Sequence, residues 1–182
     1  AARSRLQILL RRLNEEDDIE TICFIWVLLT KSTMQFLEFT QQLTQNQYQN
    51  LTIIPNPENN TEIIPKLAKG ISNLKILDLG KLLAKEILDG AESTEIEGIL
   101  ADFMNKEKSE FFLITNSGIL FDASLNLDPL RLFRRLSDTR KLIVLWHGKR
   151  NNNQLTYARR GHSEYKENNI PPDASIIDLE DA

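Results

Sequence analysis

Phe111-Phe-Leu-Ile-Thr115 and Lys141-Leu-Ile-Val-Leu-Trp146 are the two stretches that decide the fold. Each is a short run rich in aromatic or β-branched residues, which predicts a strand. Between them, Asp128 and Pro129 have the residue types of an N-cap and a first helical position. Apolar residues then recur on one helical face up to Leu136, so the sequence predicts a strand, a helix and a second strand.

Further strands are expected on the amino-terminal side, at residues 21–29, 51–54 and 74–79. The first of these, Thr21–Leu29, is continuously apolar, which is the pattern of a strand buried on both faces of a parallel sheet. We expect it to be the first central strand. Two more segments lie toward the carboxyl end of the sequence. They are a short segment at residues 154–158 and a last apolar stretch, Ser175–Leu179.

Helices are expected between these strands because apolar residues recur there at helical spacing. One runs to Leu43 and a second ends at Gly90, while Thr94 and Glu97 have the spacing of a capping box that starts a third. Strands that alternate with helices are typical of α/β proteins. We therefore expect an α/β fold with a mostly parallel sheet of about five strands.

The length of 182 residues suits a single domain, with an N-terminal helix and lead-in at residues 1–20 and a last strand within residues 166–182. Twenty-two Lys and Arg against 26 Asp and Glu give a net charge of -4. This charge argues against a protein that binds nucleic acid through its overall charge.

Cys23 is the only cysteine, so no disulfide can form within the chain, and no Cys/His spacing indicates a metal site. This usage favours a reducing compartment, and we expect a cytoplasmic protein. The longest apolar run, Ile22–Leu29, is too short to cross a bilayer and lacks the flanks of a signal peptide. No membrane association is expected.

Ligands of parallel α/β sheets bind beyond the carboxyl ends of the strands. After residues 21–29 the chain reads Lys31-Ser32-Thr33, where a helix N-terminus would favour an anion such as a nucleotide phosphate. Residues 1–69 contain no glycine, so the glycine-rich loop that cradles phosphates is missing. The alternative is a basic residue followed by an ordinary helix cap.

Two further candidates end strands. Asn116 stands where a hydrolase would carry an acidic residue, and asparagine is neither a base nor a negative metal ligand. Asp122 is the nearest following carboxylate, in a loop where it could simply form a turn. His147 could sense a terminal phosphate, or could be a turn residue before Gly148.

Four arginines lie on and after the predicted helix at 129–136, and they could reach a phosphate or acidic groups of a partner: Arg131, Arg134, Arg135 and Arg140. Asp128 and Asp138 are interspersed with them, so a solvated helix face is the alternative.

The second half of the chain resembles a known family. The run Phe111–Asp122, together with Leu127-Asp-Pro-Leu130, Leu155-Thr-Tyr-Ala158 and Gly161-His-Ser-Glu-Tyr165, resembles the BrxF family, the small P-loop proteins of bacteriophage-exclusion (BREX) gene clusters. The resemblance implies a P-loop NTPase-like three-layer sandwich. It also implies an accessory role in anti-phage defence beside other exclusion components, with ATP and Mg²⁺ as ligands.

Under this resemblance, Lys31 would contact the β- and γ-phosphates and Ser32 or Thr33 the magnesium ion, while Asn116 would orient water and His147 would report on the terminal phosphate. The phosphate loop and the acid after the third strand are both degenerate, so the chain is ATPase-like at most. One alternative is a non-catalytic scaffold that binds a protein partner through the arginine helix and residues 155–165. Another is indirect association with DNA through the arginine helix inside a larger complex.

Overall fold

The structure is a computed structural model and describes residues 40–41, 50–55 and 63–177. The chain divides into two compact units, residues 1–39 and 40–182, and all described residues belong to the second. Several predictions therefore lie outside the described residues: the helix at 1–20, the central strand at 21–29 and most of the helix that runs to Leu43.

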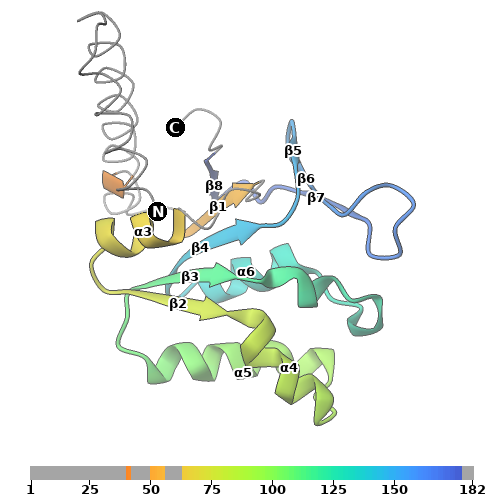
Figure 1. Cartoon of the computed structure of the whole chain (residues 1–182), viewed down its shortest axis with the longest axis horizontal. Helices are drawn as coiled ribbons and strands as arrows, with labels where there is room; N and C mark the ends of the chain where they lie inside the picture. Colours follow the sequence, from red (N-terminus) through yellow and green to blue (C-terminus); the bar gives the residue numbers. More distant parts are fainter. Residues whose placement is uncertain (1–39, 42–49, 56–62, 178–182) are drawn as a thin grey trace, which may run out of the picture. The chain divides into compact units, whose positions relative to one another are not determined.

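Five parallel strands form the main sheet of the second unit (Figure 1). They are β1 (Leu51–Pro55), β2 (Leu74–Asp78), β3 (Phe111–Thr115), β4 (Lys141–Trp146) and β8 (Ala174–Ile176), in the spatial order β2-β3-β4-β1-β8. The expected α/β fold with a mostly parallel sheet is confirmed. The strand predicted at residues 51–54 lies well inside this sheet, between β4 and β8.

Within residues 63–177 the structure has four α-helices: α3 (Ile63–Gly70), α4 (Leu79–Leu88), α5 (Ser93–Lys106) and α6 (Pro129–Ser137). Asp78 and Asp128 cap α4 and α6 with their carboxylates, which explains why each helix begins at the next residue. Gly90, at φ 95°, terminates the α4 region as its type predicts.

The start predicted for α5 is wrong by two residues. Its N-cap is Glu92, whose backbone N–H donates to Glu95 Oε2 at 2.8 Å, so the capping pair is Glu92 and Glu95. Thr94 lies inside the first turn, and the carboxylate of Glu97 instead accepts a hydrogen bond from Arg135.

Alternate side chains of each strand point to opposite faces of the sheet. On one face, Val144 belongs to a hydrophobic cluster that also contains Leu100 of α5 and Phe133 of α6. Leu145, the next residue along β4, is equally buried but lies outside this cluster, as does Leu67 of α3. Both faces of the sheet are therefore buried, which explains the continuous apolar runs of β3 and β4.

The strand order fixes where the helices lie. The connection from β1 to β2 passes across β4 and β3, whereas the connections from β2 to β3 and from β3 to β4 run in the opposite direction. Because such crossovers are right-handed, α3 belongs on one face and α4, α5 and α6 on the other. None of the helices within the described ranges is long and apolar enough to cross a membrane.

A small antiparallel sheet interrupts the chain between β4 and β8. Its strands are β5 (Arg150–Asn151), β6 (Gln154–Tyr157) and β7 (Lys166–Asn169), and we call residues 147–170 the antiparallel insertion. Leu155 and Ile170 attach it to the main core, where both side chains are buried. The sequence predicted β6 as a short segment but gave no indication of β5 or β7.

Two 3-10 turns, η2 (Ser117–Phe121) and η3 (Ala123–Leu125), connect β3 to α6. Asn116 begins the first of them in the left-handed conformation, at φ 51°, which asparagine tolerates better than most residues.

Candidate functional site

Polar side chains gather at the carboxyl edge of the parallel sheet. β2 ends at Asp78 and β3 at Thr115, which Asn116 follows directly. β4 ends at Trp146, followed by His147. Because all these strands are parallel, the three ends share one edge, and Asn116 and His147 follow neighbouring strands. We call these three strand ends the carboxyl edge.

Asp78 and Asn116 form a linked pair. Asn116 Nδ2 donates to Asp78 Oδ2 at 2.9 Å, and the backbone N–H of Lys81 donates to Asp78 Oδ1 at 3.0 Å. Desolvation alone would raise the pKa of Asp78, but the hydrogen bonds from Lys81 and Asn116 outweigh it and lower that pKa below 3.8. Asp78 is therefore ionised at neutral pH and holds the ends of β2 and β3 together.

Sequence reasoning missed Asp78 as a residue of this edge. The signal was available, since Asp78 ends an apolar strand and stands three residues before Lys81, which is the spacing of a helix cap. What the sequence could not show is that Asn116, 38 residues later, also bonds to it. The Nδ2 of Asn116 is thus bound to Asp78, whereas its Oδ1 makes no hydrogen bond within the described ranges.

His147 follows the last residue of β4 directly. Partial desolvation of the imidazole lowers the pKa of His147 below 6.5, because burial disfavours the charged form. The side chain is therefore neutral at pH 7. A neutral imidazole can both donate and accept a hydrogen bond, which suits contact with a polar ligand at this edge.

An aromatic group joins the antiparallel insertion to the sheet. Phe121 stacks on Tyr157 with ring centroids 3.7 Å apart and meets Trp146 edge-on at 5.0 Å. The indole N–H of Trp146 donates to the carbonyl of Thr156 at 2.9 Å. Burial, with the negative charge of Glu164, raises the pKa of Tyr157 above 10.0.

This aromatic group accounts for two of the motifs quoted above. Phe121 belongs to the Leu-Phe-Asp piece and Tyr157 to the Leu-Thr-Tyr-Ala piece, and the two rings are in contact although 36 positions separate them. Asp122, between η2 and η3, accepts hydrogen bonds from Ser124, which lower its pKa. In the structure it forms a turn, as the simpler interpretation predicted.

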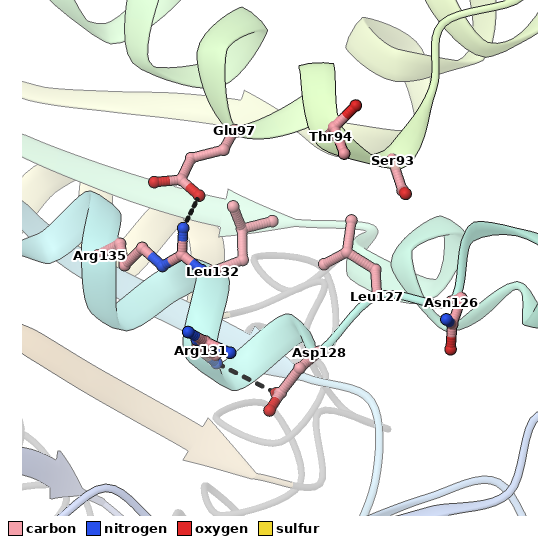
Figure 2. Close-up of a pocket in the computed structure, with 9 residues that line it drawn as sticks. All are labelled: Ser93, Thr94, Glu97, Asn126, Leu127, Asp128, Arg131, Leu132 and Arg135. Carbon is pink, nitrogen blue, oxygen red and sulfur yellow. Dashed lines mark hydrogen bonds and ion pairs between the residues drawn. The ribbon is translucent and has the colours of Figure 1, made fainter.

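A pocket of about 380 Å³ opens between α5 and α6. Figure 2 shows Leu127 and Leu132 pointing toward α5, and the ion pair between Arg135 and Glu97, at 2.6 Å, bridging the two helices. The Arg131 guanidinium, also in the lining, makes no ion pair within the described ranges. Arg131 and Arg135, two of the arginines named from the sequence, line this pocket, whereas Asn116 and His147 do not.

Two of the four arginines on and after α6 form ion pairs. Arg134 pairs with Asp173 at 2.9 Å and Arg135 with Glu97, while Arg140 donates to the carbonyl of Thr139. Arg134 and Arg135 lie on an exposed helix face, as the simpler interpretation predicted, but their ion-pair partners are Asp173 and Glu97 and not the interspersed Asp128 and Asp138.

Lys31, Ser32 and Thr33 lie outside the described residues, so their expected contacts with ATP and Mg²⁺ stay predictions. Among the residues that the structure does describe, no three His, Cys, Asp or Glu side chains gather as a metal-binding group. Comparison with known proteins finds no family model, no curated protein and no solved structure that matches this chain.

Proposed function

We propose that this chain is an accessory P-loop-like protein of a BREX-type bacterial anti-phage defence system that binds a nucleotide at the carboxyl edge without efficient hydrolysis. The observation that carries the proposal is the switch in strand order between β4 and β1, where Trp146 lies opposite Pro55. From β1 the chain crosses β4 and β3 to reach β2, whereas from β4 it crosses β1 in the opposite direction to reach β8. Open α/β sheets bind their ligands at such a point.

The groups beside this switch suit a phosphate ligand better than a hydrolytic reaction. His147 follows β4 directly and is neutral, so it can donate a hydrogen bond to a phosphate oxygen. Asn116, on the adjacent strand end, can orient a water molecule through its open Oδ1 but cannot remove a proton from it. Nucleotide binding with slow or absent hydrolysis follows from these residue types.

Separately from the carboxyl edge, we propose that Lys31 contacts the β- and γ-phosphates of ATP and Ser32 or Thr33 the magnesium ion. These contacts rest on the sequence pattern and on the resemblance to the BrxF family. Partners would be other proteins of the exclusion system, and the site of action would be the cytoplasm.

A second candidate, a scaffold that keeps the fold without binding nucleotide, is favoured by two observations. The carboxamide of Asn116 is already bound to Asp78, and this hydrogen bond gives Asn116 a structural role that requires no ligand. Residues 56–62, which follow β1 in the sequence, read Asn-Pro-Glu-Asn-Asn-Thr-Glu and contain neither a glycine nor a cation. The strand at the switch is thus not followed by a phosphate-binding sequence.

Calorimetric titration of the full chain with magnesium-ATP, and separately with a slowly hydrolysed analogue, distinguishes the two candidates. Saturable binding that is weakened at least tenfold by Lys31→Ala or His147→Ala would support the nucleotide version. The matched control is Lys106→Ala, because Lys106 ends α5 at the opposite edge of the sheet. Absence of binding by the wild-type chain would overturn this version and leave the scaffold.

The scaffold version predicts a protein-binding surface on α6. Arg131→Glu is the cleanest test, because Arg131 is exposed and its reversal breaks no ion pair within the described ranges. Reversal of Arg134 or Arg135 would also break the pairs with Asp173 and Glu97. Co-purification with the other proteins of the exclusion cluster should fall with Arg131→Glu, and unchanged co-purification would count against α6 as the contact.

A further inference from the structure

The charge of the chain is distributed unevenly. The antiparallel insertion, residues 147–170, contains five Lys and Arg against two Glu and no Asp, a net charge of +3. The whole chain carries -4, so the residues outside the insertion carry -7. The modest overall charge therefore hides a basic segment on an acidic protein.

Four of the five cations of the insertion lie on its surface, whereas the fifth, Lys166, is half-buried and donates to the carbonyl of Leu127 at 2.7 Å. Lys149, Arg150, Arg159 and Arg160 are all exposed. Neither Lys149 nor Arg159 has a side-chain hydrogen bond or ion pair within the described ranges. Arg160 pairs with Glu167 at 3.1 Å and so neutralises one of the two acids of the insertion, while its own side chain stays 83% exposed.

The backbone of the insertion holds these cations in a defined place. The carbonyl of Lys149 accepts from the Thr156 N–H at 2.8 Å, which fixes Lys149 beside β6. Arg159 and Arg160 follow β6 directly, in the connection to β7, and Figure 1 shows this connection extending away from the parallel sheet. The basic residues thus project from a hairpin that Leu155 anchors to the core.

The rest of the exposed surface of the insertion is rich in amides and lacks large apolar side chains. Asn151, Asn152, Asn153, Gln154 and Asn169 are exposed. The two large hydrophobic residues exposed within the described ranges, Ile76 and Leu88, lie elsewhere. Protein–protein interfaces need an apolar centre, whereas a polyanion is bound by cations and amides that contact its phosphates.

We propose that the antiparallel insertion is a surface that binds the phosphate backbone of double-stranded DNA. An antiparallel β-ribbon fits the major groove, where its edges can reach the phosphates on either side. The acidic remainder of the chain does not prevent this, because at 0.1 M salt charges more than about 10 Å away are largely screened. The cations that would contact DNA, Lys149, Arg150 and Arg159, are not among the residues of the proposed nucleotide site, although His147 of that site begins the insertion.

The expected binding is weak and strongly dependent on salt. Lys149 and Arg159, together with Arg150, whose Nε also donates to the carbonyl of Asn152 at 3.1 Å, give about three phosphate contacts. The logarithm of the binding constant should therefore fall with a slope of about -3 against the logarithm of salt concentration. Dissociation constants on the order of 10⁻⁵ to 10⁻⁴ M are expected near physiological salt for such a small footprint.

The test is fluorescence anisotropy of a labelled duplex of arbitrary sequence, titrated with the full chain at several salt concentrations. The double variant Lys149→Ala/Arg159→Ala should reduce the slope to about -1 and weaken binding at low salt by at least tenfold. The matched control is Arg134→Ala/Arg135→Ala, which removes the same charge from α6, where both arginines are already paired. It should leave the slope near -3.

Three results would overturn the proposal. One is no binding of duplex DNA by the wild-type chain in low salt at a protein concentration on the order of 10⁻⁴ M. Another is equal loss of binding in the two double variants, which would show that only the total charge matters. The third is tighter binding of single-stranded DNA, RNA or heparin than of the duplex. Circular dichroism of both variants confirms that each is folded.

Discussion

Substitution of Gly148 by alanine tests the contact between the end of β4 and the antiparallel insertion. A Cβ on Gly148 would lie 1.7 Å from the carbonyl oxygen of Thr156 and 2.9 Å from Trp146 Nε1. The first distance is far below any van der Waals contact, and the atom it meets is backbone. The methyl group therefore cannot be accommodated unless β6 moves away from the chain that follows β4.

The movement has a second cost. The carbonyl of Thr156 is the acceptor for the indole N–H of Trp146, a side chain that is completely buried. Displacement of β6 leaves that donor without its partner, which costs about 1–3 kcal/mol, and overpacking adds about 1–3 kcal/mol. We expect Gly148→Ala to lower the free energy of unfolding by about 2–6 kcal/mol, a large part of the 5–15 kcal/mol of a typical domain.

Urea denaturation followed by far-ultraviolet circular dichroism measures this change. The matched control is Gly98→Ala, the same chemical change on the exposed face of α5, where a Cβ would meet nothing within 4 Å. The control should raise the free energy of unfolding by about 0.5–1 kcal/mol, because alanine favours the helix. A loss below about 0.5 kcal/mol for Gly148→Ala would show that the close approach of Gly148 to Thr156 is not formed.

Three further predictions follow from single contacts. Asp128→Ala should lower the free energy of unfolding by about 1 kcal/mol because the α6 cap to Arg131 N–H is lost, whereas Asp128→Ser should retain most of it in thermal melts. Desolvation lowers the pKa of His147, so the folded chain binds this proton less tightly than the unfolded chain does, and stability should fall as pH drops through 6.5. His147→Gln should remove that part of the dependence in denaturation measured at several pH values, and an unchanged profile would contradict the assignment. Burial, aided by Glu164, raises the pKa of Tyr157, so stability should fall as pH rises above 10.0. Glu164→Gln should lower this pKa in a phenolate absorbance titration read against Tyr157→Phe, and an identical titration would refute the effect of Glu164.

The strands of the main sheet could be read from sequence because each depends on local pattern. β3 and β4 are apolar runs of five and six residues whose side chains are almost all buried, and no long-range information is needed to recognise them. The start of α6 is equally local, since the Asp128 carboxylate reaches only as far as Arg131. The start of α5 shows the limit of this approach, because Glu92 and Thr94 each stand three residues before a glutamate.

The candidate site was only partly accessible to the same reasoning. Asn116 and His147 could be named because polar residues that end apolar strands fall at a known edge of a parallel sheet. That Asn116 is bound to Asp78 depends on β2 lying next to β3, which no local pattern specifies. The position of β1 between β4 and β8 likewise follows from pairing.

By itself, the sequence indicated the strands of the main sheet and the helices α4, α5 and α6, because periodicity, caps and turns act over a few positions. It did not indicate α3, β5 or β7. Only the tertiary structure decided the strand order, the contact of Phe121 with Tyr157 and the ion pairs that neutralise Arg134 and Arg135. It also decided that four of the five cations of residues 147–170 stay exposed in or beside one small sheet. These features join residues tens of positions apart, and their free energy depends on which surfaces pack together and exclude water.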